Sequence, residues 1–114
     1  MTRYSRQISL PEIGEGGQEK LHKARVLIVG AGGLGSPAAL YLAGAGVGTI
    51  GLADDDTVGI SNLQRQILYT ENEVGQLKVH CAAQRLRALN GNIEVHAYPF
   101  RLNRENARRL IADY

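Results

Sequence analysis

One stretch, from Arg25 to Gly35, constrains the fold more than any other part of the sequence. Four apolar residues stand in a row at Val26–Val29, and a glycine-rich turn leads from them into a helical pattern. An unbroken apolar run of this kind is typical of a central parallel strand that is covered on both faces. The turn after it predicts a nucleotide loop, because the amides and the positive dipole end of the following helix attract an anion.

The glycines of this loop have separate predicted roles. Gly30 permits the tight turn, Gly32 and Gly33 let the backbone approach a phosphate, and Gly35 lets the helix pack on the strand. Leu34, inside the same turn, is included among the residues expected to line the ligand. Alone, this fingerprint favours NAD or FAD, so the residues that follow decide the nucleotide.

The rest of the chain alternates strand and helix patterns, which predicts an α/β fold. With right-handed crossovers, three parallel strands lie in the order 3-2-1, as in the first half of a doubly wound, Rossmann-like domain with helices on both faces. We expect a helical segment at 1–24 and a partial nucleotide-binding domain at 25–114. The predicted strands cover 26–29, 49–54 and 93–98; the predicted helices cover 16–23, 33–45 and 78–89, with a helical turn or two within 61–69 and a last helix after the N-cap Asn103.

The apolar spacing also predicts which residues face the core. The last strand alternates apolar and polar side chains, as a half-exposed edge strand does. The first strand is more apolar, yet it would be an open edge, which is a template for another chain. We therefore expect the chain to be a fragment or to associate. The residues expected to face inward are Leu34, Ala38, Leu42 and Ala45 on the first long helix, and Val79, Ala82, Ala83, Leu86 and Leu89 on the second.

Composition excludes several classes of function. A net charge of +2 is too small to indicate nucleic acid or a membrane surface as a partner. The single cysteine, Cys81, rules out an internal disulfide and a cysteine-built zinc site, and its place on the apolar side of a helix predicts a buried thiol. The histidines match no motif, and the late arginines are expected to form a solvated face. No long apolar run and no signal-peptide pattern are present, which predicts a cytoplasmic protein.

Acidic and basic residues follow the loop in the order that a nucleotide site requires. Asp54 ends the second strand, where a dinucleotide fold binds the ribose hydroxyls; Asp56 is a second candidate, and a solvated acidic turn is the alternative. Asn62 and Arg65 share a face of a helical turn, where the arginine suits a phosphate and an ordinary polar face is the alternative. Lys78 begins a helix, where an anion would relieve its repulsion by the dipole; a lysine that reaches water is the alternative. Two cations after one phosphate loop favour a triphosphate.

The same residues carry a resemblance that covers essentially the whole chain. Their ordered motifs resemble the N-terminal half of the ubiquitin-activating-enzyme-like adenylyltransferases. Within that family, residues 36–49 are most similar to the thiamine-pathway branch typified by ThiF, with the molybdopterin-pathway branch typified by MoeB second. The motifs are Arg3-Tyr-Ser-Arg-Gln7, Gly30-Ala-Gly-Gly-Leu-Gly35, Asp54-Asp-Asp56, Ser61-Asn-Leu-Gln-Arg-Gln66 and Gly75-Gln-Leu-Lys78.

The resemblance implies ATP and Mg²⁺ as cofactors. It implies adenylylation of the C-terminal glycine of a small ubiquitin-fold sulfur carrier, in thiamine or molybdopterin biosynthesis, with release of pyrophosphate. Arg6 matches an arginine that reaches across a homodimer to the ATP of the partner. The remaining implied roles are phosphate binding by Gly33 and its glycine neighbours, ribose binding by Asp54 and Asp56, and polyphosphate binding by Asn62, Arg65 and Lys78.

The resemblance also marks what the chain lacks. The family's next strand ends in an aspartate that holds the Mg²⁺, and the paired cysteine motifs that bind Zn²⁺ come later still; the sequence stops at Tyr114, before both. We expect most of an ATP site here and no turnover by this piece alone. Two other functions stay open. One is an NAD- or FAD-binding module of an oxidoreductase, although Asn62, Arg65 and Lys78 argue against it. The other is a non-catalytic scaffold subunit.

Overall fold

Three parallel strands form the sheet in the computed structural model, which describes residues 3–32, 35–64 and 68–114. They are β1 (Arg25–Val29), β2 (Thr49–Ala53) and β3 (Glu94–Tyr98), in the order β1-β2-β3. The central strand pairs through Ile50, which lies opposite Val26 on one side and Val95 on the other. Both the parallel pairing and the strand order predicted from the sequence are confirmed.

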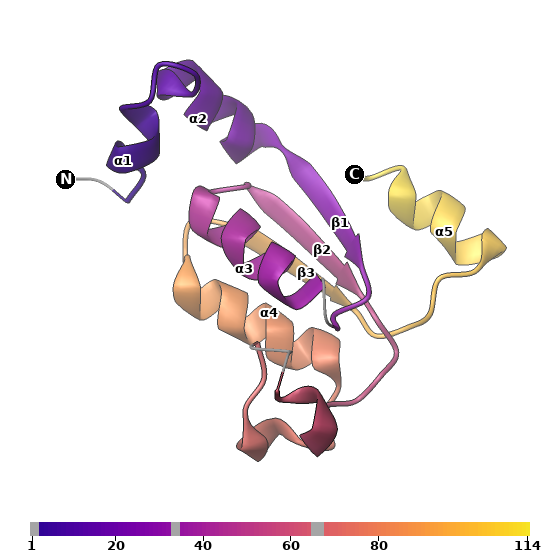
Figure 1. Cartoon of the computed structure of the whole chain (residues 1–114). Helices are drawn as coiled ribbons and strands as arrows, with labels where there is room; N and C mark the ends of the chain where they lie inside the picture. The colour runs from indigo at the N-terminus through magenta and orange to yellow at the C-terminus, as the bar shows by residue number, and fades with distance from the viewer. Residues whose placement is uncertain (1–2, 33–34, 65–67) are drawn as a thin grey trace.

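Helices lie on both sides of this sheet (Figure 1). The helices α3 (Gly35–Ala45) and α4 (Lys78–Leu89) pack on one face, and α5 (Arg104–Ile111) lies on the other. The N-terminal helices α1 (Ser5–Ile8) and α2 (Gly14–Lys23) project beyond the start of β1, and two short 3₁₀ helices, η1 (Ile60–Asn62) and η2 (Glu71–Glu73), lie in the connection before α4. The helix α1 and the 3₁₀ helix η2 were not predicted.

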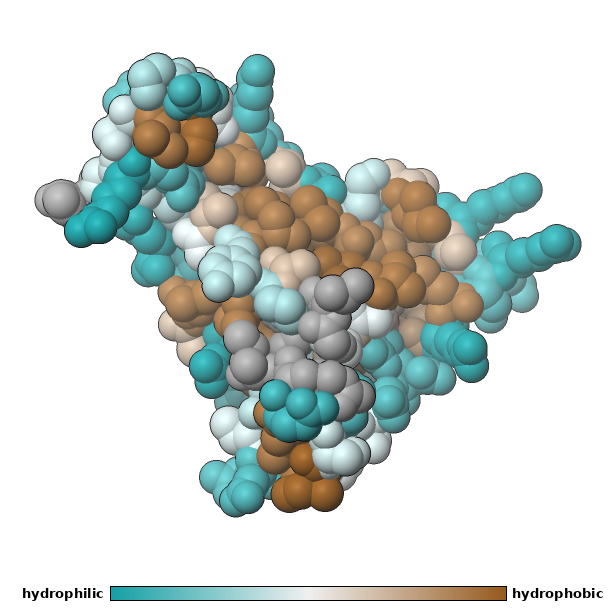
Figure 2. Space-filling view, viewed as in Figure 1, coloured by the Kyte–Doolittle hydropathy of each residue, from teal (hydrophilic) through white to brown (hydrophobic). Residues whose placement is uncertain are grey.

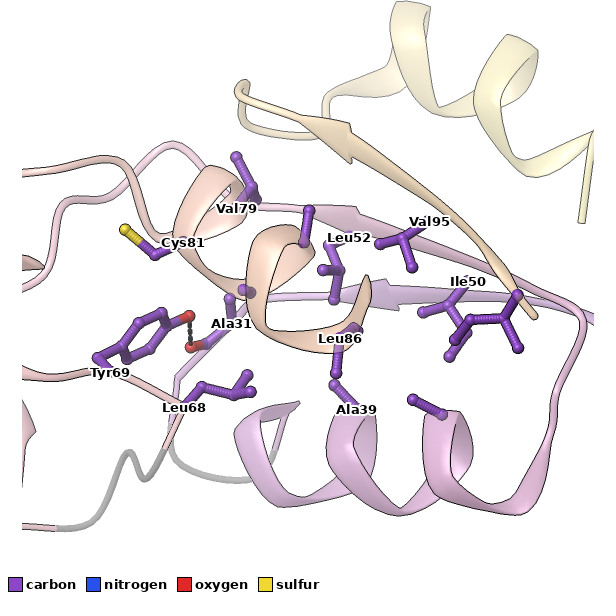
Figure 3. Close-up of a cluster of buried hydrophobic side chains, with 14 of the residues drawn as sticks. Ala31, Ala39, Ile50, Leu52, Leu68, Tyr69, Val79, Cys81, Leu86 and Val95 are labelled. Atoms are coloured by element: carbon purple, nitrogen blue, oxygen red, sulfur yellow. Dashed lines mark hydrogen bonds between the residues drawn. The ribbon is translucent and has the colours of Figure 1, made fainter. Parts of the chain in front are cut away.

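The core fills the space between the sheet and the helices α3 and α4 (Figure 3). Ile50, Leu52 and Leu86 are fully buried there, and each such side chain contributes about 1.5–3 kcal/mol by leaving water. Cys81 is buried beside them, as predicted. On α4 the predicted inward face is confirmed for Val79, Ala82, Ala83 and Leu86.

Two predicted core positions are wrong. On α3 the buried residues are Ala39 and Ala43, whereas Ala38 is exposed. The helix carries no charged residue, so its sequence has no polar face from which the buried face could be read. Leu89, the last residue of α4, is 42% exposed, whereas Leu86 and Asn90 are buried. The side of this helix end that faces inward is therefore the one that carries Leu86 and Asn90, four residues apart. Leu34 lies outside the described residues.

The N-terminal helices are fixed to the ends of α3 and α4. The side chains of Gln7 and Gln18 donate to the carbonyl of Ala45, at 2.7 and 3.1 Å, and Arg3 donates to the carbonyl of Leu89 at 2.9 Å. These contacts satisfy carbonyls that a helix end otherwise leaves without a partner. They hold α1 and α2 at the end of the sheet where the strands begin.

The outer edge of β1 has no partner strand among the described residues. Figure 2 shows an apolar band along this strand, between the N-terminal helices and α5. Val29 is 63% exposed at its end. In the part of the chain that the structure describes, none of the helices combines the length and the apolar character that crossing a bilayer requires.

Candidate functional site

The glycine turn lies where β1 ends. Gly30 adopts a φ of +91°, a conformation that favours glycine, and its N–H donates to the carbonyl of Ala53 at 2.8 Å. A Cβ at Gly35 would lie 2.2 Å from the carbonyl oxygen of Gly30. The tight turn and the close helix–strand packing predicted for these two glycines are therefore present. Gly33 and Leu34 lie outside the described residues, and their contacts with a ligand stay predictions.

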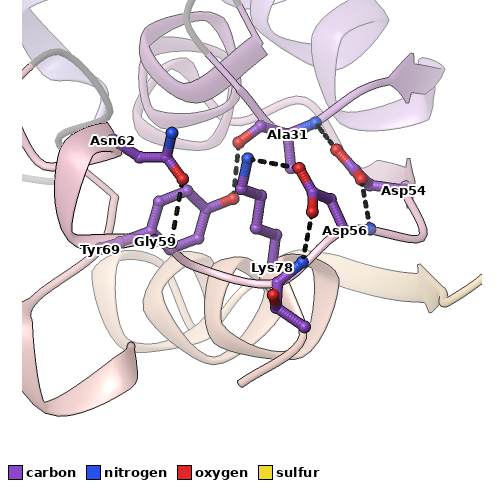
Figure 4. Close-up of polar contacts among 8 residues, drawn as sticks. Ala31, Asp54, Asp56, Gly59, Asn62, Tyr69 and Lys78 are labelled. Carbon is purple, nitrogen blue, oxygen red and sulfur yellow. Dashed lines mark hydrogen bonds and ion pairs between the residues drawn. The ribbon is translucent and has the colours of Figure 1, made fainter. Parts of the chain in front are cut away.

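Asp54 follows β2 directly and faces this turn (Figure 4). Its Oδ2 accepts from the N–H of Ala31 at 2.7 Å, and its Oδ1 accepts from the N–H of Asp56 at 2.8 Å. A carboxylate offers about four acceptor positions, so these two amides leave it able to accept from a ligand hydroxyl as well. Ribose binding stays a prediction, and a second role in holding the loop, which the sequence did not indicate, is observed.

A closed loop brings the start of α4 back to the end of β2. Thr57 and Leu77 form an antiparallel bridge. Gly75, with a φ of +91°, makes the turn that returns the chain, and its N–H donates to the carbonyl of Val58 at 2.8 Å. Lys78, the next residue after the bridge, therefore lies beside the acidic residues that follow β2.

The ammonium group of Lys78 is buried, so the alternative of a lysine that reaches water is wrong. Its side chain is 6% exposed, and its Nζ lies 3.3 Å from Oδ2 of Asp56, a residue whose own side chain is 65% exposed. The N–H of Thr57, and next the ammonium of Lys78, hold the pKa of Asp56 below its ordinary value. Burial and the dipole of α4 both disfavour the cation, and one exposed carboxylate compensates for them only in part. A second anion beside Lys78 would therefore be stabilised.

The remaining predicted site residues lie in different surroundings. Asn62, at the end of η1, accepts through Oδ1 from the N–H of Gly59 at 2.9 Å. Asp55 is exposed. Gly32 lies in a partly exposed bend next to Ala31. Arg65 lies outside the described residues, and its shared face with Asn62 stays a prediction.

Arg6 is separated from the other candidate residues. It is exposed on α1, at the end of the sheet where the strands begin. The glycine turn, Asp54 and Lys78 gather at the opposite end, where β1 and β2 end (Figure 1). The structure of one chain therefore does not bring Arg6 to the rest of the site.

Tyr69 is a site residue that the sequence did not indicate. Its side chain is buried, and its hydroxyl donates to the carbonyl of Ala31 at 2.6 Å (Figures 3 and 4). Burial, and next the nearby carboxylate of Asp54, raise its pKa well above the ordinary value, so the hydroxyl keeps its proton. No signal in the sequence connects two residues so far apart along the chain.

A metal ion has no set of ligands among the described residues. No group of three histidine, cysteine, aspartate or glutamate side chains gathers there in a way that could hold one. Asp54 and Asp56 instead hold backbone amides and Lys78. Asp54 and Asp56 therefore do not fit a metal by themselves.

Comparison with known proteins identifies the family of this chain. The model of the ThiF family matches residues 4–114. The chain belongs to the ThiF family. A sulfur carrier protein adenylyltransferase of Thermus thermophilus is 50% identical over 114 residues, and an adenylyltransferase and sulfurtransferase MOCS3 of Anopheles gambiae is 55% identical over 114 residues. The match covers all of this chain, but it spans only 42% and 26% of those two relatives.

Solved structures of the family share the fold. The Escherichia coli tRNA N6-threonylcarbamoyladenosine dehydratase TcdA superposes with a TM-score of 0.90 at 32% identity, covering 96% of this chain and 45% of that protein. The E. coli protein MccB in a structure with ATP superposes with a TM-score of 0.81 at 33% identity, covering 97% of this chain and 33% of that protein. The predicted Rossmann-like α/β class is confirmed.

Proposed function

We propose that this chain is the ATP-binding part of an adenylyltransferase that activates the C-terminal carboxylate of a ubiquitin-fold sulfur-carrier protein. The observation that carries the proposal is the buried ammonium of Lys78, whose ion-pair partner among the described residues is the exposed Asp56, two residues after the Asp54 that holds the Ala31 amide of the glycine turn. The relatives named for adenylylation, and a family member solved with ATP, support the same nucleotide.

The proposed reaction is a transfer of AMP. A carboxylate oxygen of the carrier attacks the α-phosphorus of ATP, the bond from that phosphorus to the bridging oxygen breaks, and pyrophosphate leaves with the electron pair. Negative charge develops on the leaving group, where Lys78 and Arg65 would stabilise it. Asn62 and the amides around Gly32 and Gly33 would hold the phosphates, and holding the reactants in place lowers the barrier further.

The nucleoside end of ATP would lie against the residues that follow β2. Asp54 has acceptor capacity beyond the two amides that it already holds, which supports a contact with the ribose hydroxyls. Mg²⁺ bound with the triphosphate would neutralise part of its charge. The described residues do not supply its ligands.

Arg6 would serve a partner's site rather than its own. It lies at the edge of the sheet opposite the glycine turn, and α1 is held there by Gln7 and by Arg3. Residues 1–24 would therefore act as an arm of a homodimer, and residues 25–114 as the nucleotide-binding unit. The reaction would take place in the cytoplasm, the compartment predicted from the sequence.

The test of this function is carrier-dependent exchange of labelled pyrophosphate into ATP, by a protein of the relatives' length that contains this chain. We expect exchange only when the carrier is present and Lys78 is intact. Lys23→Ala is the matched control, because Lys23 is an exposed lysine paired with Glu19 on α2. An NAD- or FAD-binding module, or a scaffold subunit, would show no exchange with any variant.

A further inference from the structure

Ala31 is held from two sides by side chains that lie far from it in the sequence. The residue is 1% exposed. Its N–H donates to Asp54, 23 residues away, and its carbonyl accepts from the hydroxyl of Tyr69, 38 residues away. Both backbone polar groups of this one residue therefore have fixed directions, set by two different loops.

The direction of the Ala31 carbonyl determines the direction of the next amide. A trans peptide is planar, and its C=O and N–H point in opposite directions; the described residues contain no cis peptide. The carbonyl of Ala31 points at Tyr69, which is buried in the core (Figure 3). The N–H of Gly32 therefore points away from the core, toward the partly exposed side of the turn.

We propose that the hydroxyl of Tyr69 is a positioning group for phosphate binding: by holding the Ala31 carbonyl inward, it aims the Gly32 amide at a phosphate of the nucleotide. The proposal rests on the proposed function, since it needs a phosphate at the turn. Tyr69 itself makes no contact with the ligand, and it acts through the peptide between Ala31 and Gly32.

Tyr69 is suited to this role because it is fixed and remains a donor. Its ring is buried in the core cluster. The next residue, Thr70, is the N-cap of η2, and its N–H donates to the carboxylate of Glu73 at 2.8 Å. Burial raises the pKa of the Tyr69 hydroxyl above its ordinary value, so at neutral pH the hydroxyl keeps the proton that it donates to the carbonyl.

The test compares two tyrosine variants by calorimetric titration with ATP and with adenosine. Tyr69→Phe removes only the hydroxyl. Tyr98→Phe is the matched control, because its hydroxyl bonds that of Tyr114 at 2.8 Å on the other side of the sheet. Losing one neutral hydrogen bond changes an equilibrium by about two- to tenfold, so Tyr69→Phe should weaken ATP by about that factor and leave adenosine unchanged. Tyr98→Phe should leave the ratio of the two affinities as it is in the wild type.

The outcomes separate this inference from the proposed function. If the wild-type chain binds ATP no better than adenosine, the phosphate site itself is wrong. If the wild type prefers ATP and Tyr69→Phe keeps that preference while losing only stability, Tyr69 is merely structural and the inference is overturned.

A second measurement needs no variant, in case Tyr69→Phe does not fold. In the wild type, the Gly32 amide proton should shift in an NMR titration with ATP and not with adenosine. An unchanged Gly32 resonance in the presence of bound ATP would also overturn the inference.

Discussion

Replacing Lys78 with methionine should stabilise the chain without ligand while weakening ATP. The substitution removes a buried cation from the first turn of α4, where the dipole disfavours it by about 0.3–1 kcal/mol. It also removes the ion pair with Asp56, but that carboxylate is 65% exposed and stays hydrated; a pair of this kind contributes about 0–1 kcal/mol. Methionine fills a similar volume, so the free energy of unfolding should rise by up to about 1 kcal/mol from the removed dipole repulsion and desolvation.

The same substitution removes a charged contact to the triphosphate. A hydrogen bond to a charged group contributes about 1.5–3 kcal/mol, so ATP should bind about 10- to 150-fold more weakly, while adenosine should bind as before. Urea unfolding measures the first effect and calorimetry the second. Lys23→Met, at an exposed pair with Glu19, should change neither. A large loss of stability together with an unchanged preference for ATP over adenosine would show that Lys78 is structural and does not bind the triphosphate.

Four further predictions concern other parts of the molecule. Asp54→Ala should weaken ATP more than 2′,3′-dideoxy-ATP in the same titration; equal losses would leave only the role of Asp54 in holding the loop. Burial raises the pKa of the Cys81 thiol to about 11, so the thiol should not react with a disulfide reagent at neutral pH until urea unfolds the chain. The stability that the protonated thiol contributes should be present below pH 9.0 and be lost as the pH rises to about 11. Rapid reaction in the folded state would contradict this burial. In a protein of the relatives' length, mixing Arg6→Ala subunits with subunits disabled at Arg65 should restore part of the activity, and no recovery in a confirmed heterodimer would mean that Arg6 acts within its own subunit. The open apolar edge of β1, with Val29 63% exposed, should make this chain self-associate at micromolar concentration; a monodisperse 12.3 kDa species in light scattering would contradict that expectation.

The features that the sequence predicted are the local ones and the strand order, which follows from right-handed crossovers between successive parallel strands. The apolar run Val26–Val29 and the glycine at position 30 determine a strand and a turn within a few residues, and the structure has both. The bounds of α4 follow in the same way from its apolar period. The buried face of α3 could not be predicted, because a helix without a charged residue has no polar side to exclude.

The features that the sequence did not predict depend on contacts between distant segments. The burial of Lys78 results from the bridge between Thr57 and Leu77, which brings the start of α4 back to Asp56. The bond from Tyr69 to Ala31 likewise joins residues 38 apart. The sequence shows which residue types are present and at what spacing, but the pairing of loops in the fold determines which of them are in contact.

Competition between ATP and NAD tests whether this site binds a triphosphate rather than a dinucleotide. Calorimetric titration of this 114-residue chain, with each nucleotide alone and then with ATP added to chain already mixed with NAD, gives both affinities under one condition. ATP should bind more tightly than NAD, and Lys78→Met should remove most of the difference. Tighter binding of NAD, unaffected by Lys78→Met, would contradict the account and support an oxidoreductase module.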